Sequence, residues 1–211
     1  MSLILFFVTV TVAMFALVNP IGALPVLISV TEGYTRQDII KVVKNAAFIE
    51  ALMLFSFMFL GVYIFKVLGI NINDFKVAGG VLLFKVAFDM LQGKTSNTKM
   101  TPTEKEESAE RSSVGIAPIG TPLLAGPGSI TTAMIYFNSY SVDLPEKIIA
   151  IISVAVVVVL TYIILYYSNN IFRVLGKTGS LIISRIMGLL LASIAVDFMV
   201  TGLAYIVHTI M

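Results

Sequence analysis

The sequence predicts an all-α integral membrane protein with six transmembrane helices arranged as a 3+3 inverted repeat. Of its 211 residues, 58% are hydrophobic and only 12% are charged. That balance is typical of proteins that face lipid and not of soluble domains. Long apolar segments match the hydrocarbon core of a bilayer, roughly 30 Å thick, and the two halves of the chain resemble each other.

The apolar segments predict spans over about 3–31, 39–68, 75–92, 114–139, 146–169 and 179–209. Residues 93–113 are rich in Lys, Glu, Ser and Thr. Such a segment buries too little apolar surface to fold alone, so it predicts a linker. We expect one membrane domain made of two three-helix repeats, residues 1–92 and 114–211, joined by the polar linker 93–113.

Spans 1 and 4 each contain a proline at a predicted break. The first span has no charge from Leu3 to Val30, about 42 Å of helix, and Asn19-Pro20-Ile21-Gly22 lies in its middle. Proline removes a backbone donor and clashes with the preceding turn, whereas Asn caps a helix well and Pro suits its first position. We therefore expect the helix to stop and restart near the midplane. Gly126-Pro127-Gly128-Ser129 predicts the same in span 4. A simple proline kink is the alternative for either break alone.

The two halves repeat each other at a nearly constant offset. Residues 80–89 align with residues 188–197 at an offset of 108, and five of the ten positions are identical. Pro20 and Pro127 differ by 107 positions, so the same offset nearly superposes the breaks. Three spans per half is an odd number, so the second half enters the membrane in the opposite orientation, as in many secondary transporters.

Basic residues are divided unequally between the two ends of the predicted spans. Ten lie on the side of the linker and three on the other, leaving out Lys85 inside span 3. The positive-inside rule then predicts a cytoplasmic linker and both termini outside. The ten are Arg36, Lys41, Lys44, Lys94, Lys99, Lys105, Arg111, Arg173, Lys177 and Arg185, and the three are Lys66, Lys76 and Lys147.

Composition also excludes several classes of function. The absence of Cys excludes disulfides and thiol chemistry, and with a single histidine, His208, we expect no metal site and no cofactor. A net charge of +2 is too small and scattered to indicate nucleic acid. No catalytic constellation is recognisable and the GxxxxGK[ST] motif is absent, so we do not expect an enzyme.

Two motifs make the chain resemble the MarC family of prokaryotic inner-membrane proteins. They are Asn19-Pro20-Ile21-Gly22-Ala23-Leu24-Pro25 and Leu124-Ala125-Gly126-Pro127-Gly128-Ser129-Ile130. The resemblance covers the whole chain, including its length, its six spans and its polar linker. It implies transport in the inner membrane of a prokaryote, and for some members it implies small neutral amino acids, with glycine and alanine as substrates.

The inverted orientation predicts a binding site at the midplane. Both half-helices that start at the prolines direct their N-termini, with unpaired N–H groups and partial positive charge, at the membrane centre, which suits a carboxylate. The preceding half-helices end there with unpaired carbonyls, which suit an ammonium group. A small zwitterion satisfies both conditions. The expected substrate-binding residues are Asn19, Pro20, Ile21, Gly22, Ala23, Gly126, Pro127, Gly128, Ser129, Thr131 and Thr132.

Four ionisable residues inside the predicted spans are candidates for coupling or gating: Asp89, Asp197, Glu50 and Lys85. Such residues are costly in a bilayer and are often functional. Asp89 and Asp197 occupy equivalent places in the repeat, and the alternative for each is a position at a helix end that reaches water. For Glu50 and Lys85 the sequence favours a structural ion pair over a coupling role.

Together these features predict a secondary transporter of glycine and alanine, coupled to a proton gradient in preference to sodium. The alternatives within membrane proteins are a channel or facilitator, an exporter of another small solute, and a membrane protein that transports nothing. The partners expected are therefore a small zwitterionic amino acid, a proton and the lipid bilayer. The sequence leaves the oligomeric state open.

Overall fold

The computed structural model describes residues 2–69, 71–93, 119–120, 123–138 and 143–210. These residues form helices and turns with no strand among them, which confirms the all-α class. The helices are α1 (Leu3–Val18), α2 (Pro20–Val30), α3 (Arg36–Leu68), α4 (Ile72–Leu91), α6 (Pro127–Asn138), α7 (Leu144–Tyr166) and α8 (Ser168–Ile210). Most of the linker 93–113, and with it the domain division, falls outside the described residues.

Local sequence explains where several of these helices begin. Asn71 caps α4 by accepting a hydrogen bond from the N–H of Asn73 at 2.9 Å. At the start of α7, the Asp143 side chain accepts from the backbone of Glu146, whose own side chain accepts from the Asp143 N–H in return. This reciprocal capping box satisfies donors that have no partner inside the helix.

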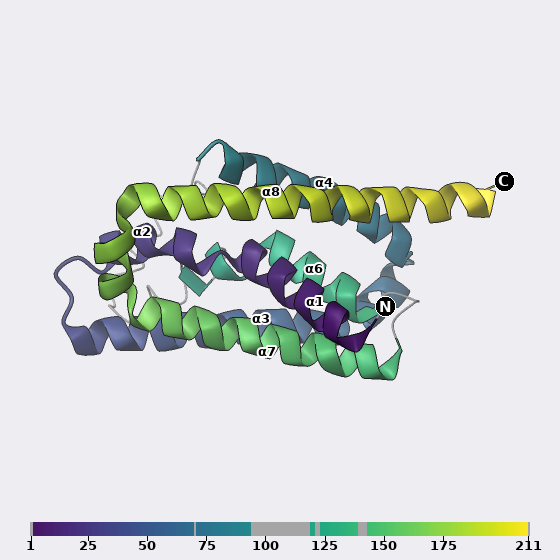
Figure 1. Ribbon diagram of the computed structural model, residues 1–211. Helices are drawn as coiled ribbons and strands as arrows, with labels where there is room; N and C mark the ends of the chain where they lie inside the picture. The colour runs from purple at the N-terminus through teal and green to yellow at the C-terminus, as the bar shows by residue number, and fades with distance from the viewer. Residues whose placement is uncertain (1, 70, 94–118, 121–122, 139–142, 211) are drawn as a thin grey trace.

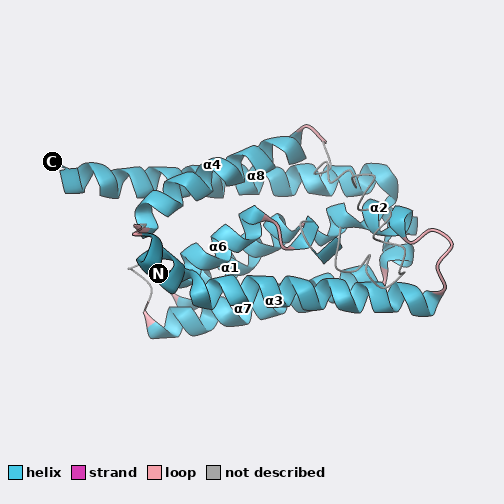
Figure 2. Cartoon of the chain, turned by 180° about the vertical axis from the view of Figure 1, so that it is seen from behind, coloured by secondary structure: helices cyan, strands magenta, loops and turns pink. Residues whose placement is uncertain are grey.

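The helices lie roughly parallel in an elongated bundle (Figures 1 and 2). α4 and α8 pack together along one side, α3 and α7 lie along the opposite side, and α1, α2 and α6 lie between them. The two ends of the chain lie at the same end of the bundle in both views. A chain whose ends lie at the same end of a bundle runs along the length of the bundle an even number of times.

Four stretches within the described helices are long and apolar enough to cross a bilayer: Leu3–Val30, Arg36–Gly61, Leu144–Tyr166 and Ser168–His208. The chain is therefore an α-helical membrane protein. Predicted spans 3 and 4 are not among the four. α4 has 20 residues but includes Asp74, Lys76, Lys85 and Asp89, and α6 has only 12 residues.

The last predicted span is part of a longer helix. α8 begins at Ser168 and bends at Gly176, whose φ of 61° and ψ of −175° are not helical. Glycine adopts a positive φ without steric cost, so it allows the sharp bend seen between the short first part of α8 and its long second part (Figure 1). The predicted start at 179 therefore misses a helical segment before the bend.

Glycines bring α4 and α8 into close contact. A Cβ atom on Gly80 would lie 2.8 Å from the Ala195 carbonyl oxygen, and one on Gly188 would lie 3.1 Å from the Ala87 carbonyl oxygen. The offset of 108 that relates Gly80 to Gly188 also relates Ala87 to Ala195. The contact between the two helices is therefore reciprocal.

Candidate functional site

The chain between α1 and α2 consists of one residue, Asn19, in the left-handed conformation with φ 46° and ψ 57°. Its N–H donates to the Phe15 carbonyl at 2.9 Å, which completes the last turn of α1. Its Oδ1 accepts from the Gly22 N–H at 3.2 Å, which caps α2. Asn tolerates this conformation better than most residues, because its short side chain can hydrogen-bond locally. One residue thus stabilises the break on both sides, through its backbone N–H toward α1 and its side chain toward α2.

The backbone before α6 has a different local structure from the backbone at Asn19. The Ala125 N–H donates to the Gly120 carbonyl at 3.0 Å, a wider turn than that of an α-helix. α6 then begins at Pro127, and the Ser129 hydroxyl lies 3.1 Å from the Leu124 carbonyl oxygen and 3.0 Å from that of Gly126. The Ser129 hydroxyl therefore bonds back to the segment before α6, where the Gly126 carbonyl also accepts from the Ile130 N–H at 3.1 Å.

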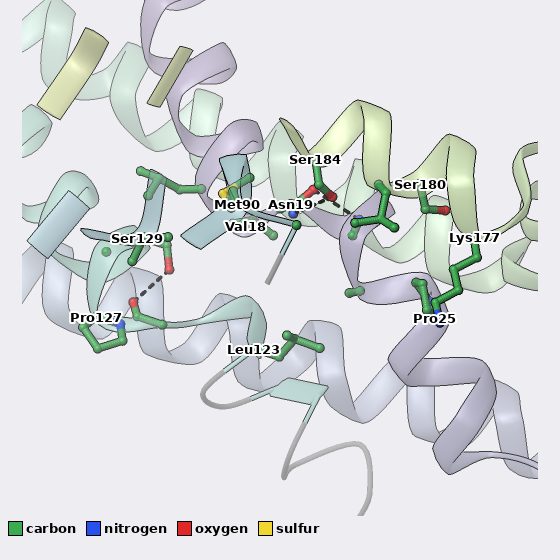
Figure 3. Close-up of a pocket in the computed structure, with 18 residues that line it drawn as sticks. Val18, Asn19, Pro25, Met90, Leu123, Pro127, Ser129, Lys177, Ser180 and Ser184 are labelled. Atoms are coloured by element: carbon green, nitrogen blue, oxygen red, sulfur yellow. Dashed lines mark hydrogen bonds between the residues drawn. The ribbon is translucent and has the colours of Figure 1, made fainter. Parts of the chain in front are cut away.

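The two breaks meet inside the bundle. A Cβ atom on Gly128 would lie 3.1 Å from Leu17 Cδ2, so the start of α6 touches the end of α1. A cavity of about 350 Å³ lies between the breaks, and residues of α1, α2, α4, α6 and α8 line it (Figure 3). From these breaks α2 and α6 run toward opposite ends of the bundle (Figure 1).

Seven of the residues expected to bind substrate line this cavity: Asn19, Gly22, Ala23, Gly126, Pro127, Gly128 and Ser129. Four do not. Pro20 is buried and Ile21 is half-buried beside the cavity residues. Thr131 is buried and its Cγ2 packs against Gly79 of α4, while Thr132 is buried with a hydroxyl that has no hydrogen-bond partner.

α8 contributes polar residues that the sequence did not single out. Ser184 Oγ accepts a hydrogen bond from Asn19 Nδ2 at 3.2 Å, which ties the first break to α8 (Figure 3). Ser180 lines the cavity, is 2% exposed, and its hydroxyl has no hydrogen-bond partner among the residues that the structure describes. Lys177 lies on the same lining. The spacing of 177, 180 and 184 places all three on one helix face, a polar stripe that helical periodicity can detect.

The cavity is lined by both hydrogen-bond donors and hydrogen-bond acceptors. Gly128 and Ser129 lie in the first turn of α6, where N–H groups have no acceptor within the helix. The Ala16 and Leu123 carbonyls lie four residues before a proline and therefore lack a helical donor. The one charged side chain on the described lining is Lys177. Both poles of a zwitterion can thus meet backbone groups here.

The four ionisable candidates occupy different environments. Glu50 is fully buried in α3, Asp89 is half-buried, and Lys85 and Asp197 are exposed on the bundle. Glu50 Oε1 accepts from Thr161 Oγ1 at 3.3 Å, whereas Oε2 has no partner. The expected ion pair between Glu50 and Lys85 is therefore wrong, because Glu50 points to α7 and Lys85 lies on the exposed face of α4.

Comparison with known proteins agrees with the two motifs. The model of the MarC family of integral membrane proteins matches residues 4–207. The chain belongs to the MarC family. Similar MarC-family chains include the UPF0056 membrane protein YvbG of Bacillus subtilis strain 168, 36% identical over 199 residues, which are 94% of each chain. The UPF0056 membrane protein MJ1677 of Methanocaldococcus jannaschii is 34% identical over 94% of this chain and 96% of its own. YhcE of Escherichia coli K12, also a UPF0056 membrane protein, is 35% identical over 91% and 89%. No solved structure gives a significant match.

Substitution of Asn19 should separate the roles of its backbone and its side chain in this MarC-family protein. Asn19→Ala should lower the free energy of unfolding by about 1–2 kcal/mol, because it removes both the cap of α2 and the short polar side chain that lets Asn tolerate the left-handed region. Asn19→Gly should lose less, since glycine adopts that conformation freely. A denaturant titration in detergent measures both. An Ala variant as stable as the wild type would contradict the capping role.

Proposed function

We propose that this MarC-family chain is a secondary transporter that binds a small neutral amino acid, such as glycine or alanine, between its two helix breaks. The observation that carries the proposal is the convergence of two helix N-termini and a buried, unpartnered Ser180 hydroxyl on one cavity. A buried hydroxyl without a partner costs free energy, and a polar ligand removes that cost.

The arrangement suits the two charged groups of an amino acid. The substrate carboxylate lies near the first turns of α2 and α6, where partial positive charge and unpaired N–H groups favour an anion. The ammonium group meets the carbonyls before the prolines and the hydroxyls of Ser180 and Ser184. The cavity of about 350 Å³ is near the lower limit of roughly 300 Å³ for ligand pockets. It therefore favours a small substrate accompanied by water.

The packing of α4 against α8 supports the 3+3 inverted repeat. Reciprocal glycine contacts at one offset are what a pseudo-twofold axis between two equivalent helices produces. The starts of α2 and α6 lie beside each other and point to opposite ends of the bundle, as the inverted halves of a transporter require. We place both breaks near the midplane of the bilayer.

The shape of the cavity favours alternating access over a channel. Its lining extends from the breaks to Pro25 and Lys177 at one end. Toward the end that carries the termini, Tyr136 packs between Phe6 and Phe198, with ring centroids 6.1 and 5.6 Å away. Phe6 is 5% and Phe198 is 4% exposed. A channel needs a continuous wet path, whereas this aromatic cluster fills the bundle on one side of the site.

The distribution of basic residues supports an orientation with the Lys177 end of the cavity in the cytoplasm and both termini outside, which we propose for the inner membrane of a prokaryote. Similar chains from a bacterium and an archaeon, both named as membrane proteins, support a prokaryotic membrane. The described structure thus corresponds to a state that faces the cytoplasm. A single cysteine introduced as Ser96→Cys should react only with reagents that reach the cytoplasm. Labelling from outside by an impermeant reagent would contradict the proposed orientation and support the opposite one.

A proton gradient is the proposed source of energy, since the chain lacks a nucleotide-binding motif. We assign no enzymatic activity to it. Counterflow of labelled glycine in proteoliposomes distinguishes a carrier from a channel, an exporter of other solutes or a protein that transports nothing. A carrier accelerates uptake when unlabelled glycine is inside, and the other three do not.

Binding should depend on Ser180 and on substrate size. Titration of the purified protein should rank glycine and alanine above leucine, because neighbouring side chains already occupy the space beside Gly22 and Gly128, where the proposed site binds the charged groups. Ser180→Ala should weaken glycine binding by about three- to tenfold, since one hydrogen bond contributes about 0.5–1.5 kcal/mol.

Ser193→Ala is the matched control for this titration. Ser193 lies on the same helix, is exposed, and its hydroxyl donates to the Leu189 carbonyl at 3.3 Å. The glycine affinity of the Ser193→Ala variant should equal that of the wild type. Equal affinity for all three amino acids, or no effect of Ser180→Ala, would contradict a binding site between the two breaks.

A further inference from the structure

Glu50 is a buried carboxyl group that the cavity does not use. It lies in α3 and is 0% exposed, and it is the one acidic or basic side chain among the buried polar residues of the described chain. Ionisable groups are costly to bury inside a membrane protein, and those that are buried there are often functional.

Among the described residues, the immediate surroundings of Glu50 hold a hydroxyl but no cation. Oε1 accepts from Thr161 Oγ1 of α7, and Oε2 has no hydrogen-bond partner. One turn away on α3 lie Ala46 and Leu54, both fully buried and apolar. The lysines Lys41 and Lys44 near the start of α3 are exposed.

The titratable residues of the two helices that pack most against α3 make their contacts elsewhere. Glu146 serves the capping box of α7, and Lys147 lies 5.6 Å over the Phe137 ring. On α7, Tyr162 and Tyr166 pack against each other at 5.9 Å. On α6, Tyr136 belongs to the aromatic cluster.

Within the described part of the chain, an ionised Glu50 carboxylate would have no counter-charge, and one of its oxygens would have no hydrogen-bond partner. Both conditions make the charged form unfavourable in a low-dielectric interior, whereas the neutral acid needs only ordinary hydrogen bonds. We propose that Glu50 is the site where the driving proton binds, and that it carries this proton in the conformation described. The inference rests on the proposed transport function and names its coupling ion and residue.

Glu50 is connected to the cavity through packing. Ala46 and Leu54 belong to the apolar cluster that also contains Leu124 and Ala133, which lie on either side of the second break. Loss of the proton places a charge against this cluster, and water must enter or the helices must repack to solvate it. α3 therefore shifts against α6 and α7 when the proton leaves, and the wall of the cavity at Gly126–Ser129 moves with it.

The two aspartates lack this constraint. Asp197 is exposed and Asp89 is half-buried. Neither side chain is fully enclosed by the bundle, so ionisation of either does not leave a charge sealed among apolar side chains as it does at Glu50.

Proteoliposomes that contain wild-type protein or Glu50→Gln test the proposal. The Gln side chain mimics the protonated acid but releases no proton. With a pH gradient of about one unit, wild-type protein should concentrate glycine up to about tenfold, because one unit is a tenfold ratio of proton activity. Glu50→Gln should reach an accumulation ratio of about one while keeping glycine counterflow.

Asp89→Asn and Asp197→Asn are the matched controls and should accumulate glycine as the wild type does. Normal accumulation by Glu50→Gln, or loss of accumulation in a control variant alone, overturns the assignment to Glu50. Absence of glycine counterflow in the wild type instead contradicts the transport function itself.

Infrared spectroscopy examines the proton independently of transport. Purified wild-type protein at neutral pH should show the carbonyl band of a protonated carboxyl group, and Glu50→Gln should lack it. If that variant does not fold, Thr161→Val provides the second measurement, because loss of the hydroxyl should shift the band. A wild-type spectrum without such a band, or a band that Thr161→Val leaves unshifted, overturns the proposal.

Discussion

A helix that breaks inside a bilayer leaves backbone groups that lipid cannot satisfy, and protein or ligand must take the place of water. This constraint explains the arrangement around both breaks. Asn19 serves the ends of two helices and is tied to Ser184 of α8, while the Ser129 hydroxyl serves two carbonyls beside Pro127. Helices α3, α4, α7 and α8 pack against these segments. Under the function proposed above, the same groups that make the breaks costly in lipid would bind the two charged ends of a zwitterion.

Local chemistry made much of this predictable. Asn19 and Pro20 are a cap and a first helical residue in any helical protein, and the structure starts α2 at Pro20 and α6 at Pro127. The apolar composition and the length of the apolar segments predict the all-α membrane class, because apolar segments of that length are typical of helices that cross a bilayer. The two motifs determine the family, and the match to residues 4–207 confirms it. Seven of the eleven expected binding residues line the cavity because they lie at the breaks themselves.

Features set by the rotation of one helix against another could not be predicted in the same way. Thr131 and Thr132 follow the second break closely in sequence, yet α6 turns Thr131 onto Gly79 of α4. Ser180 and Ser184 reach the cavity because Gly176 bends α8 before them, and a positive φ at one glycine has no clear signal in a sequence. The partner of Glu50 is Thr161, which is 111 positions away. Such contacts arise from packing between distant segments.

The central claim is that a small amino acid occupies the space between the two breaks. The chain has no cysteine, so a single Ser184→Cys substitution reports on that space alone. Ser184 lines the cavity and is half-buried, and Ser193→Cys on the exposed face of α8 is the reference. Glycine should slow the reaction of a small thiol reagent at position 184 in a saturable way and leave the reaction at 193 unchanged. If glycine leaves both rates unchanged at every concentration, the amino acid does not bind between the breaks.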